Sequence, residues 1–175
     1  MRFVVDCHDP IGQDRLEHMG YLAIGPDRFT TRWFAAEAGA SRHFGRFAAS
    51  LEAMVLQSAR LVPVPWEDAL EAFLARAAGT PLRWWLYGSA ARALRGEPAD
   101  PGDIDVHVDE ALLAGSIFDD LLVTPVERME GWVAPWTGRA FDHAIIEWIA
   151  APPFRPPALE VVRWRGYEVP VVPGG

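Results

Sequence analysis

Leu86-Tyr87-Gly88-Ser89 and Pro101-Gly102-Asp103-Ile104-Asp105-Val106-His107-Val108 are the two stretches that decide the fold of this chain. The apolar run from Arg83 to Tyr87 predicts a buried strand, which breaks at the Gly-Ser pair into a short helix over residues 90–95. Ser89 is a suitable N-cap, because its hydroxyl can accept a hydrogen bond from a backbone N–H of the first turn. The first stretch therefore predicts a strand, a tight turn and a helix start in succession.

The predicted turn is suited to binding phosphate. Gly88 lets a ligand approach the backbone, and the free N–H groups behind it carry the positive end of the helix dipole. Arg92 lies one helical turn beyond Ser89, so its guanidinium can lean toward a triphosphate. The alternative for Arg92 is a solvent-facing position on the helix. Gly96 suits the left-handed residue that ends a helix, which makes this helix short.

The second stretch places two acids on one face of a predicted strand. Asp103 and Asp105 are two positions apart, so their side chains point the same way at a separation of about 6 to 7 Å. Ile104, Val106 and Val108 point the other way, into the core. Two carboxylates at this spacing can share one or two divalent cations, which bridge the oxygens of a nucleoside triphosphate. The alternative is an edge strand whose aspartates are simply solvated.

Together, the Gly-Ser turn and the Asp-Ile-Asp strand, with thirteen residues between Ser89 and Asp103, resemble a family signature. The family is the nucleotidyltransferase superfamily related to DNA polymerase beta, and the resemblance is greatest to small bacterial members that move a nucleotide onto an antibiotic or a protein. It covers roughly residues 82–108 and extends more loosely to about residue 150. It implies a mixed α/β fold, in which helices flank a mixed β-sheet.

The resemblance also implies a set of functional groups. Mg²⁺ or Mn²⁺ would be the metal, and a nucleoside triphosphate such as ATP would be the substrate. Gly88, Ser89 and Arg92 would bind the nucleotide, while Asp103 and Asp105 would be catalytic residues and metal ligands. The superfamily usually supplies a third carboxylate from a later strand, which completes the metal site and can serve as the base for the acceptor.

Two acids compete for the third position on a strand predicted over residues 139–150. Asp142 and Glu147 are five positions apart, so on a regular strand they face opposite sides and only one can reach the aspartate pair. The resemblance implies Glu147 as the third acid, because related small proteins carry an acid within an apolar run such as Ile146-Glu147-Trp148, and Asp142 remains the alternative.

Composition limits the class of protein. The chain has 175 residues, of which 50% are hydrophobic and 23% are charged, which is typical of a globular protein. Its formal net charge of -8 argues against binding long nucleic acid, an affinity that comes mainly from basic residues. Cys7 is the only cysteine, which excludes an intrachain disulfide. The acidic start of the chain lacks the apolar block of a secretory signal, so we expect a cytoplasmic protein.

Phosphate contacts from side chains must come from arginine, because the chain contains no lysine. Proline-rich segments mark the predicted domain limits. Val62-Pro63-Val64-Pro65 separates an N-terminal extension, residues 1–62, from a nucleotidyltransferase-like core, residues 63–150. A proline-rich connector and a C-terminal hairpin, expected to pack on the core, occupy residues 151–175. The other predicted helices span residues 31–38, 44–61, 66–78 and 111–122, and the other predicted strands span residues 2–5, 21–24, 123–129, 159–164 and 167–172.

Two functions remain open at this point. The first is a metal-dependent enzyme that moves a nucleoside monophosphate from a nucleoside triphosphate to a small-molecule or protein acceptor. The second is a regulator or toxin–antitoxin partner of the same fold that binds nucleotide or metal without catalysis. The absence of lysine and the open identity of the third acid favour the second. The sequence assigns no chemistry to residues 1–62.

Overall fold

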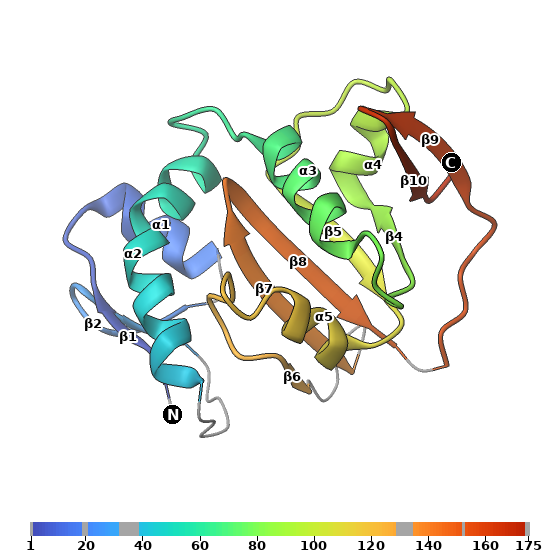
Figure 1. Ribbon diagram of the computed structural model, residues 1–175. Coiled ribbons are helices and arrows are strands. Elements are labelled where there is room, and N and C mark those ends of the chain that lie inside the picture. The colour runs from blue at the N-terminus through green and yellow to red at the C-terminus, as the bar shows by residue number, and fades with distance from the viewer. Residues whose placement is uncertain (1, 19–20, 32–38, 129–134, 152, 174–175) are drawn as a thin grey trace.

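The computed structural model describes residues 2–18, 21–31, 39–128, 135–151 and 153–173. Two β-sheets organise these residues, a seven-stranded mixed sheet and a three-stranded antiparallel sheet (Figure 1). The seven-stranded sheet has the order β6-β7-β8-β5-β4-β10-β9, and the three-stranded sheet has the order β1-β3-β2. This mixed α/β architecture confirms the predicted fold class.

The bounds of the elements follow from the backbone. The helices are α1 (Pro10–His18), α2 (Ala40–Ser58), α3 (Trp66–Ala77), α4 (Gly88–Leu94) and α5 (Ala111–Ile117). The strands of the small sheet are β1 (Val4–Asp6), β2 (Leu22–Gly25) and β3 (Arg28–Thr30). The strands of the large sheet are β4 (Trp84–Tyr87), β5 (Asp103–Val108), β6 (Glu127–Arg128), β7 (Trp136–Asp142), β8 (Ala144–Ala150), β9 (Glu160–Trp164) and β10 (Tyr167–Val171).

The main core lies between the large sheet and the helices α3 and α5, which cover one of its faces (Figure 1). Phe73 of α3 stacks on Phe118 with ring centroids 5.4 Å apart, and Phe118 lies 5.8 Å from the buried indole of Trp148 on β8. Trp148 fills the space above Gly138 on β7, where an added Cβ would lie 2.3 Å from the indole ring. This packing fixes β7 and β8, the strands that border β5.

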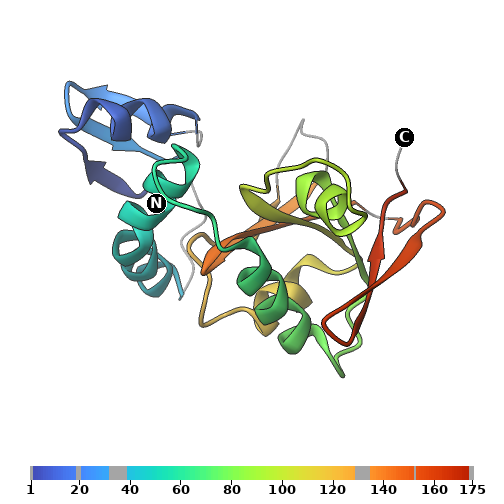
Figure 2. The same ribbon diagram turned by 90° about the horizontal axis from the view of Figure 1, so that it is seen from above.

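The N-terminal unit, residues 2–58 where described, has a second apolar core. Phe47 and Met54 of α2 pack there against the small sheet, and Phe141 and Ile145 of the large sheet contact the same cluster. The two units lie side by side, joined by the segment between α2 and α3 (Figure 2). The N-terminal unit therefore rests on one end of the β7–β8 hairpin.

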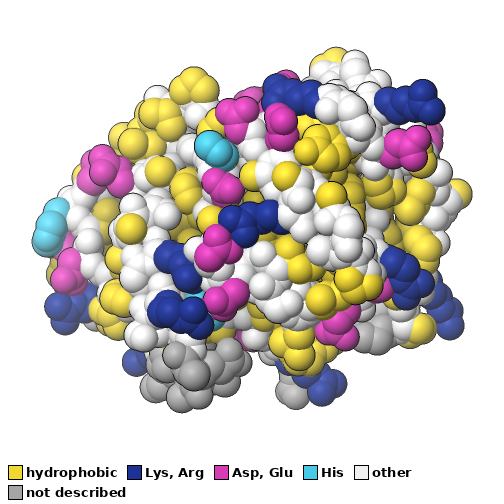
Figure 3. Space-filling view, viewed as in Figure 1, with side chains coloured by type: hydrophobic (Ala, Val, Ile, Leu, Met, Phe, Trp, Pro, Cys, Tyr) yellow, Lys and Arg dark blue, Asp and Glu magenta, His cyan; other side chains and the backbone are white. Residues whose placement is uncertain are grey.

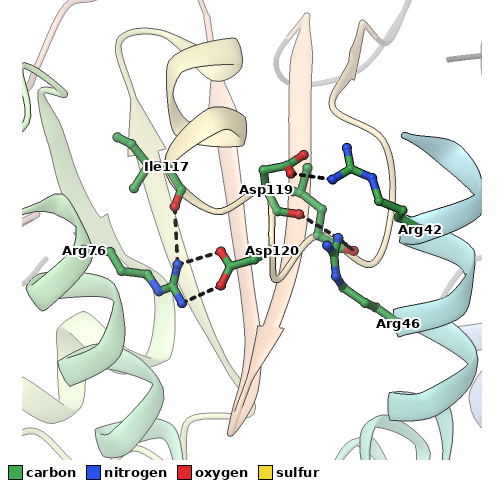
Figure 4. A network of polar contacts seen from close by, with 7 residues as sticks. Arg42, Arg46, Arg76, Ile117, Asp119 and Asp120 are labelled. Atoms are coloured by element: carbon green, nitrogen blue, oxygen red, sulfur yellow. Dashed lines mark hydrogen bonds and ion pairs between the residues drawn. The ribbon is translucent and has the colours of Figure 1, made fainter. Parts of the chain in front are cut away.

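Polar contacts also join the units, through the loop that follows α5 (Figure 4). Arg46 of α2 donates hydrogen bonds to the backbone carbonyls of Asp119, at 2.6 Å, and Leu122, at 3.5 Å. Arg76 of α3 forms two hydrogen bonds with the Asp120 carboxylate, at 2.7 and 2.9 Å. The loop is thus held by α2 on one side and by α3 on the other. Figure 3 shows acidic and arginine side chains interspersed over this face of the molecule.

Most predicted elements are present, with some differences. The predicted strand over residues 139–150 is instead the end of β7 and all of β8, because the chain reverses at His143, which has a positive φ of 64°. The strand predicted over residues 123–129 is reduced to the two residues of β6. The helix predicted over residues 31–38 lies outside the described residues. The hairpin of β9 and β10 is confirmed, and β10 extends the sheet beside β4.

The predicted role of Ser89 as an N-cap is wrong. Helix α4 begins one residue earlier, at Gly88, and Tyr87 holds the N-cap position in an extended conformation without a side-chain capping hydrogen bond. Ser89 therefore lies inside the first turn. Gly96 has a φ of 79° just beyond the helix, as predicted. No described helix is long and apolar enough to cross a membrane. The proposed domain limits at residues 62 and 150 stay predictions.

Candidate active site

Strand β5 presents the predicted acids on one face. Asp103, Asp105 and His107 are partly exposed, whereas Ile104, Val106 and Val108 between them are fully buried in the main core. The alternation follows from the two-residue period of a strand. The acids consequently lie on the face of the sheet opposite α3 and α5.

The Gly88 turn lies directly against the second acid. Tyr87 of β4 is the cross-strand partner of Asp105, and the chain turns at Gly88 with a φ of 70°. A Cβ added at Gly88 would lie 2.3 Å from Oδ2 of Asp105, which is shorter than any normal contact. Glycine is thus required at this position both for its conformation and for the close approach of the carboxylate. The turn and the aspartate strand are brought together.

Glu147, and not Asp142, shares the face of the aspartate pair. Glu147 is the direct partner of Asp105 in the parallel pairing of β5 and β8. Asp142 pairs with Ala144 at the tip of the β7–β8 hairpin, three positions from the Arg139–Glu147 pair, so its side chain belongs to the opposite face of the sheet. Its carboxylate lies 3.5 Å from His143. Asp103, Asp105 and Glu147 therefore occupy neighbouring positions on two adjacent strands.

Arg139 is a residue of this face that the sequence did not indicate. It is the antiparallel partner of Glu147 on β7, and its Nη2 and Nε lie 2.6 and 2.9 Å from Oε2 of Glu147. Both side chains are largely buried, with exposed fractions of 26% and 17%. The Arg139–Glu147 pair was missed from the sequence because the hairpin turn at His143 was not predicted. Without that turn, nothing in the sequence places Arg139 opposite Glu147.

Burial and mutual repulsion perturb the acids. Burial, followed by the nearby negative charges of Asp103 and Glu147, raises the pKa of Asp105 to about 7. The pKa of Asp103 is also raised, mainly by burial and by Glu147, against the opposing effect of Arg139 and Arg60. Burial and the same three acids raise the pKa of the Tyr87 hydroxyl. The face thus carries three carboxylates, and the Arg139 guanidinium neutralises only the charge of Glu147.

A cavity of about 430 Å³ lies on the α4 side of this face, and we call it the α4 cavity. Its lining includes the predicted nucleotide residues Gly88 and Arg92, together with Arg95. Arg92 bonds to Glu97 at 3.1 Å and to the Pro98 carbonyl at 3.2 Å, and its side chain is half exposed. Ser89 is partly buried in the first turn of α4 and is not among the lining residues.

The acid set of this face suits a divalent cation in part. Carboxylate oxygens are the ligands that Mg²⁺ prefers, and the raised pKa values of Asp103 and Asp105 reflect a repulsion that a cation would relieve. Among the described residues, however, no three His, Cys, Asp or Glu side chains are grouped closely enough to hold a metal. On this face, the Glu147 carboxylate is bonded to Arg139 at 2.6 Å. The aspartate pair fits a cation, and Glu147 fits only if its carboxylate is shared with or released by Arg139.

Comparisons with known proteins were made at the level of sequence and of structure. No family model matches the chain, and no curated protein matches it. Among solved structures, the chain is similar to a protein of Thermotoga maritima described as a "putative nucleotidyltransferase". The TM-score is 0.54 at 20% identity, over 63% of this chain and 80% of the other. The chain has a nucleotidyltransferase-like fold.

This nucleotidyltransferase-like fold agrees with the resemblance inferred from the Gly-Ser turn and the aspartate strand. More than a third of the chain lies outside the shared region, since 63% of it is covered. The structural similarity, at a TM-score of 0.54, establishes the fold. At 20% identity, the chemistry has to be inferred from the residues of the site. Those residues come from β4 and α4, from β5, and from the β7–β8 hairpin.

Proposed function

We propose that this protein is a metal-dependent nucleotidyltransferase, which moves a nucleoside monophosphate from a nucleoside triphosphate to an acceptor. The observation that carries the proposal is the proximity of Gly88 and Asp105: a Cβ added at Gly88 would lie only 2.3 Å from Oδ2 of Asp105, so a strand acid lies against the turn that opens α4. A structural role alone does not explain why three partly buried acids face one another beside a cavity lined by two arginines.

Each residue has a role in this proposal. Asp103 and Asp105, with Glu147, would hold Mg²⁺ or Mn²⁺, which when bound neutralises the triphosphate and the charge that develops in the transition state. Gly88 would let the phosphates approach the backbone, and Arg92 would supply positive charge from the wall of the α4 cavity. Ser89 would contact the phosphates only through its backbone N–H, because its hydroxyl does not cap the helix.

The chemical step is a displacement at phosphorus. An acceptor hydroxyl oxygen forms a bond to the α phosphorus while the bond from that phosphorus to the bridging oxygen breaks, and pyrophosphate leaves with the electron pair. The proton of the hydroxyl passes to the Glu147 carboxylate. Arg139, bonded to the same carboxylate, would orient it for this transfer.

The test is release of labelled pyrophosphate from γ-labelled ATP with Mg²⁺ and a broad acceptor panel, measured in the wild type and in Asp103→Asn and Asp105→Asn. These substitutions preserve side-chain size, so the fold, checked by circular dichroism, should be unchanged. We expect release to fall by at least a hundredfold in each variant. Equal turnover in wild type and variants would reject the assignment of the aspartate pair.

A second function is favoured by one observation, the pairing of Arg139 with Glu147. A guanidinium 2.6 Å from the third acid can replace a metal ion as its countercharge. The protein would then bind nucleotide without transferring it and act as a regulator or as a toxin–antitoxin partner. Calorimetry with ATP, followed by a pyrophosphate assay over a broad acceptor panel, separates the two functions. Binding without any release would favour the regulator.

A further inference from the structure

A second cavity lies on the other side of the acid set. It has a volume of about 260 Å³ and lies between the end of α2 and the large sheet, and we call it the α2 pocket. Its lining shares no residue with that of the α4 cavity. The polar residues that line the α2 pocket and matter below are Gln57, Ser58, Arg60, Asp103, Arg139 and Glu147.

The acids of the face are divided between the two cavities. Asp103 and Glu147 line the α2 pocket, whereas Tyr87 and Gly88, the neighbours of Asp105 on β4 and α4, line the α4 cavity. Asp105 lies between them, because it pairs with Tyr87 on one side and with Glu147 on the other. Displacement at phosphorus needs the attacking and leaving oxygens roughly in line, on opposite sides of the transferred group. The two cavities therefore offer one candidate site on each side of Asp105 for the attacking and leaving groups.

The charges of the two linings differ. The α4 cavity has two arginines, Arg92 and Arg95, which both bond to its single acid, Glu97, so its lining carries one more positive than negative charge. In the α2 pocket, each arginine is already paired: Arg139 with Glu147 at 2.6 Å, and Arg60 with Asp100 at 3.5 Å. Arg60 also donates to the backbone carbonyls of residues 100 and 101, at 2.8 and 3.0 Å. No arginine of the α2 pocket is left over for an anionic ligand.

Hydrogen-bonding groups remain in the α2 pocket. Among the described residues, Oε1 of Gln57 has no hydrogen-bond partner, although Gln57 is only 7% exposed, and the half-buried carboxylate of Asp103 lines the same pocket. The orientation of the Gln57 amide is fixed, since its Nε2 donates to the His143 carbonyl at 2.7 Å and Oε1 must therefore be an acceptor. Ser58 adds a hydroxyl beside them. The pocket thus offers acceptors to a ligand that brings O–H donors.

We propose that the α2 pocket is the acceptor subsite, and that it takes a small uncharged molecule with several hydroxyl groups, of about the size of a monosaccharide. The proposal rests on the proposed transfer activity and gives the N-terminal unit its role, because α2 builds one wall of the pocket. A volume of 260 Å³ is slightly below the usual range for pockets that bind drug-sized ligands, which suits such a molecule. One hydroxyl beside Asp103 and Glu147 would attack the nucleotide from the side opposite the α4 cavity.

Two variants block the cavities separately. Ser58→Trp fills the α2 pocket at the last residue of α2, and its matched control is Ala49→Trp at an exposed position of the same helix that lines neither cavity. Arg92→Ala removes positive charge from the α4 cavity, and its control is Arg163→Ala, whose side chain is 87% exposed. If Ser58→Trp fails to fold by circular dichroism, Ser58→Gln replaces it.

Binding of two ligands is then measured on the full chain. Glucose and myo-inositol are the hydroxyl compounds, followed by saturation-transfer NMR, and ATP with Mg²⁺ is followed by calorimetry. We expect Ser58→Trp to weaken binding of the hydroxyl compounds at least tenfold and to change ATP affinity by less than twofold. Arg92→Ala should show the reverse, and both controls should behave as the wild type.

The proposal is overturned if neither hydroxyl compound binds the wild type, if Ser58→Trp leaves their binding unchanged, or if Ser58→Trp weakens ATP to the same extent. Failure of the proposed function has a different signature, namely no ATP binding and no pyrophosphate release by the wild type. Label transfer from α-labelled ATP to the bound compound, lost in Ser58→Trp, is the further result that supports the subsite.

Discussion

The Gly88 turn allows a sharp prediction for Gly88→Ala. Alanine at a φ of 70° is in the left-handed region, which costs about 1 to 2 kcal/mol of folding free energy. The new Cβ would also lie 2.3 Å from Oδ2 of Asp105, so the carboxylate must rotate away. Because the obstructing atom is the end of a side chain, the rotation adds little to the cost in stability. It removes Asp105 from the position that we assign to a metal ligand.

Gly79→Ala is the matched control, because Gly79 has a φ of 73° and nothing lies within 4 Å of an added Cβ. Urea unfolding should show similar losses of stability for both variants, equivalent to a fall in Tm of about 2 to 8 °C for a chain of this size. Mn²⁺ binding, measured by electron paramagnetic resonance, should weaken at least tenfold in Gly88→Ala alone. Wild-type Mn²⁺ affinity in Gly88→Ala would refute the claim that the Gly88–Asp105 contact positions a ligand.

Three further predictions concern the acids and the packing beneath them. Arg139→Gln leaves Glu147 unpaired and should lower the free energy of unfolding by about 3 kcal/mol, measured by urea unfolding. Added Mg²⁺ should then raise the stability of this variant more than that of the wild type. An equal effect of Mg²⁺ on both proteins would contradict this prediction. Asp105 has a pKa of about 7 when folded against an ordinary value of 3.8, so the folded state binds more protons between these values and stability falls as the pH rises from 4 to 7. In Asp105→Asn the difference in unfolding free energy between pH 5 and pH 8 should be smaller, and an unchanged difference would show that another group is responsible. Gly138→Ala places a Cβ 2.3 Å from the Trp148 ring and should lower the free energy of unfolding by about 1 to 3 kcal/mol. An unchanged free energy of unfolding would show that Trp148 can shift to make room for the methyl group.

Local patterns predicted the part of the site that lies within one continuous stretch. The alternation of acids and β-branched residues in β5 determines its two faces, and the Gly-Ser turn follows from the strong breaking tendency of that pair. The resemblance placed these two stretches in one fold, and the structure brings Gly88 against Asp105. These inferences needed only neighbouring residues.

The remaining features depend on contacts between distant parts of the chain. The turn at His143 is made by a residue with no strong turn tendency, so the β7–β8 hairpin was expected as one strand and Arg139 went unnoticed. The preference for Glu147 over Asp142 came from the resemblance to proteins with an acid in a similar apolar run, and the pairing of Glu147 with Asp105 supplies the physical reason for its position. The α2 pocket was beyond prediction, because it joins α2 to strands more than forty residues away.

The most direct test of the central claim is a crystal structure of the protein with Mn²⁺ and a non-hydrolysable ATP analogue, with the metal located by its anomalous signal. We predict the signal beside Asp103 and Asp105, with the triphosphate extending past Gly88 toward Arg92. A signal at another site, or a nucleotide bound away from Gly88 while this face holds no metal, would contradict the account.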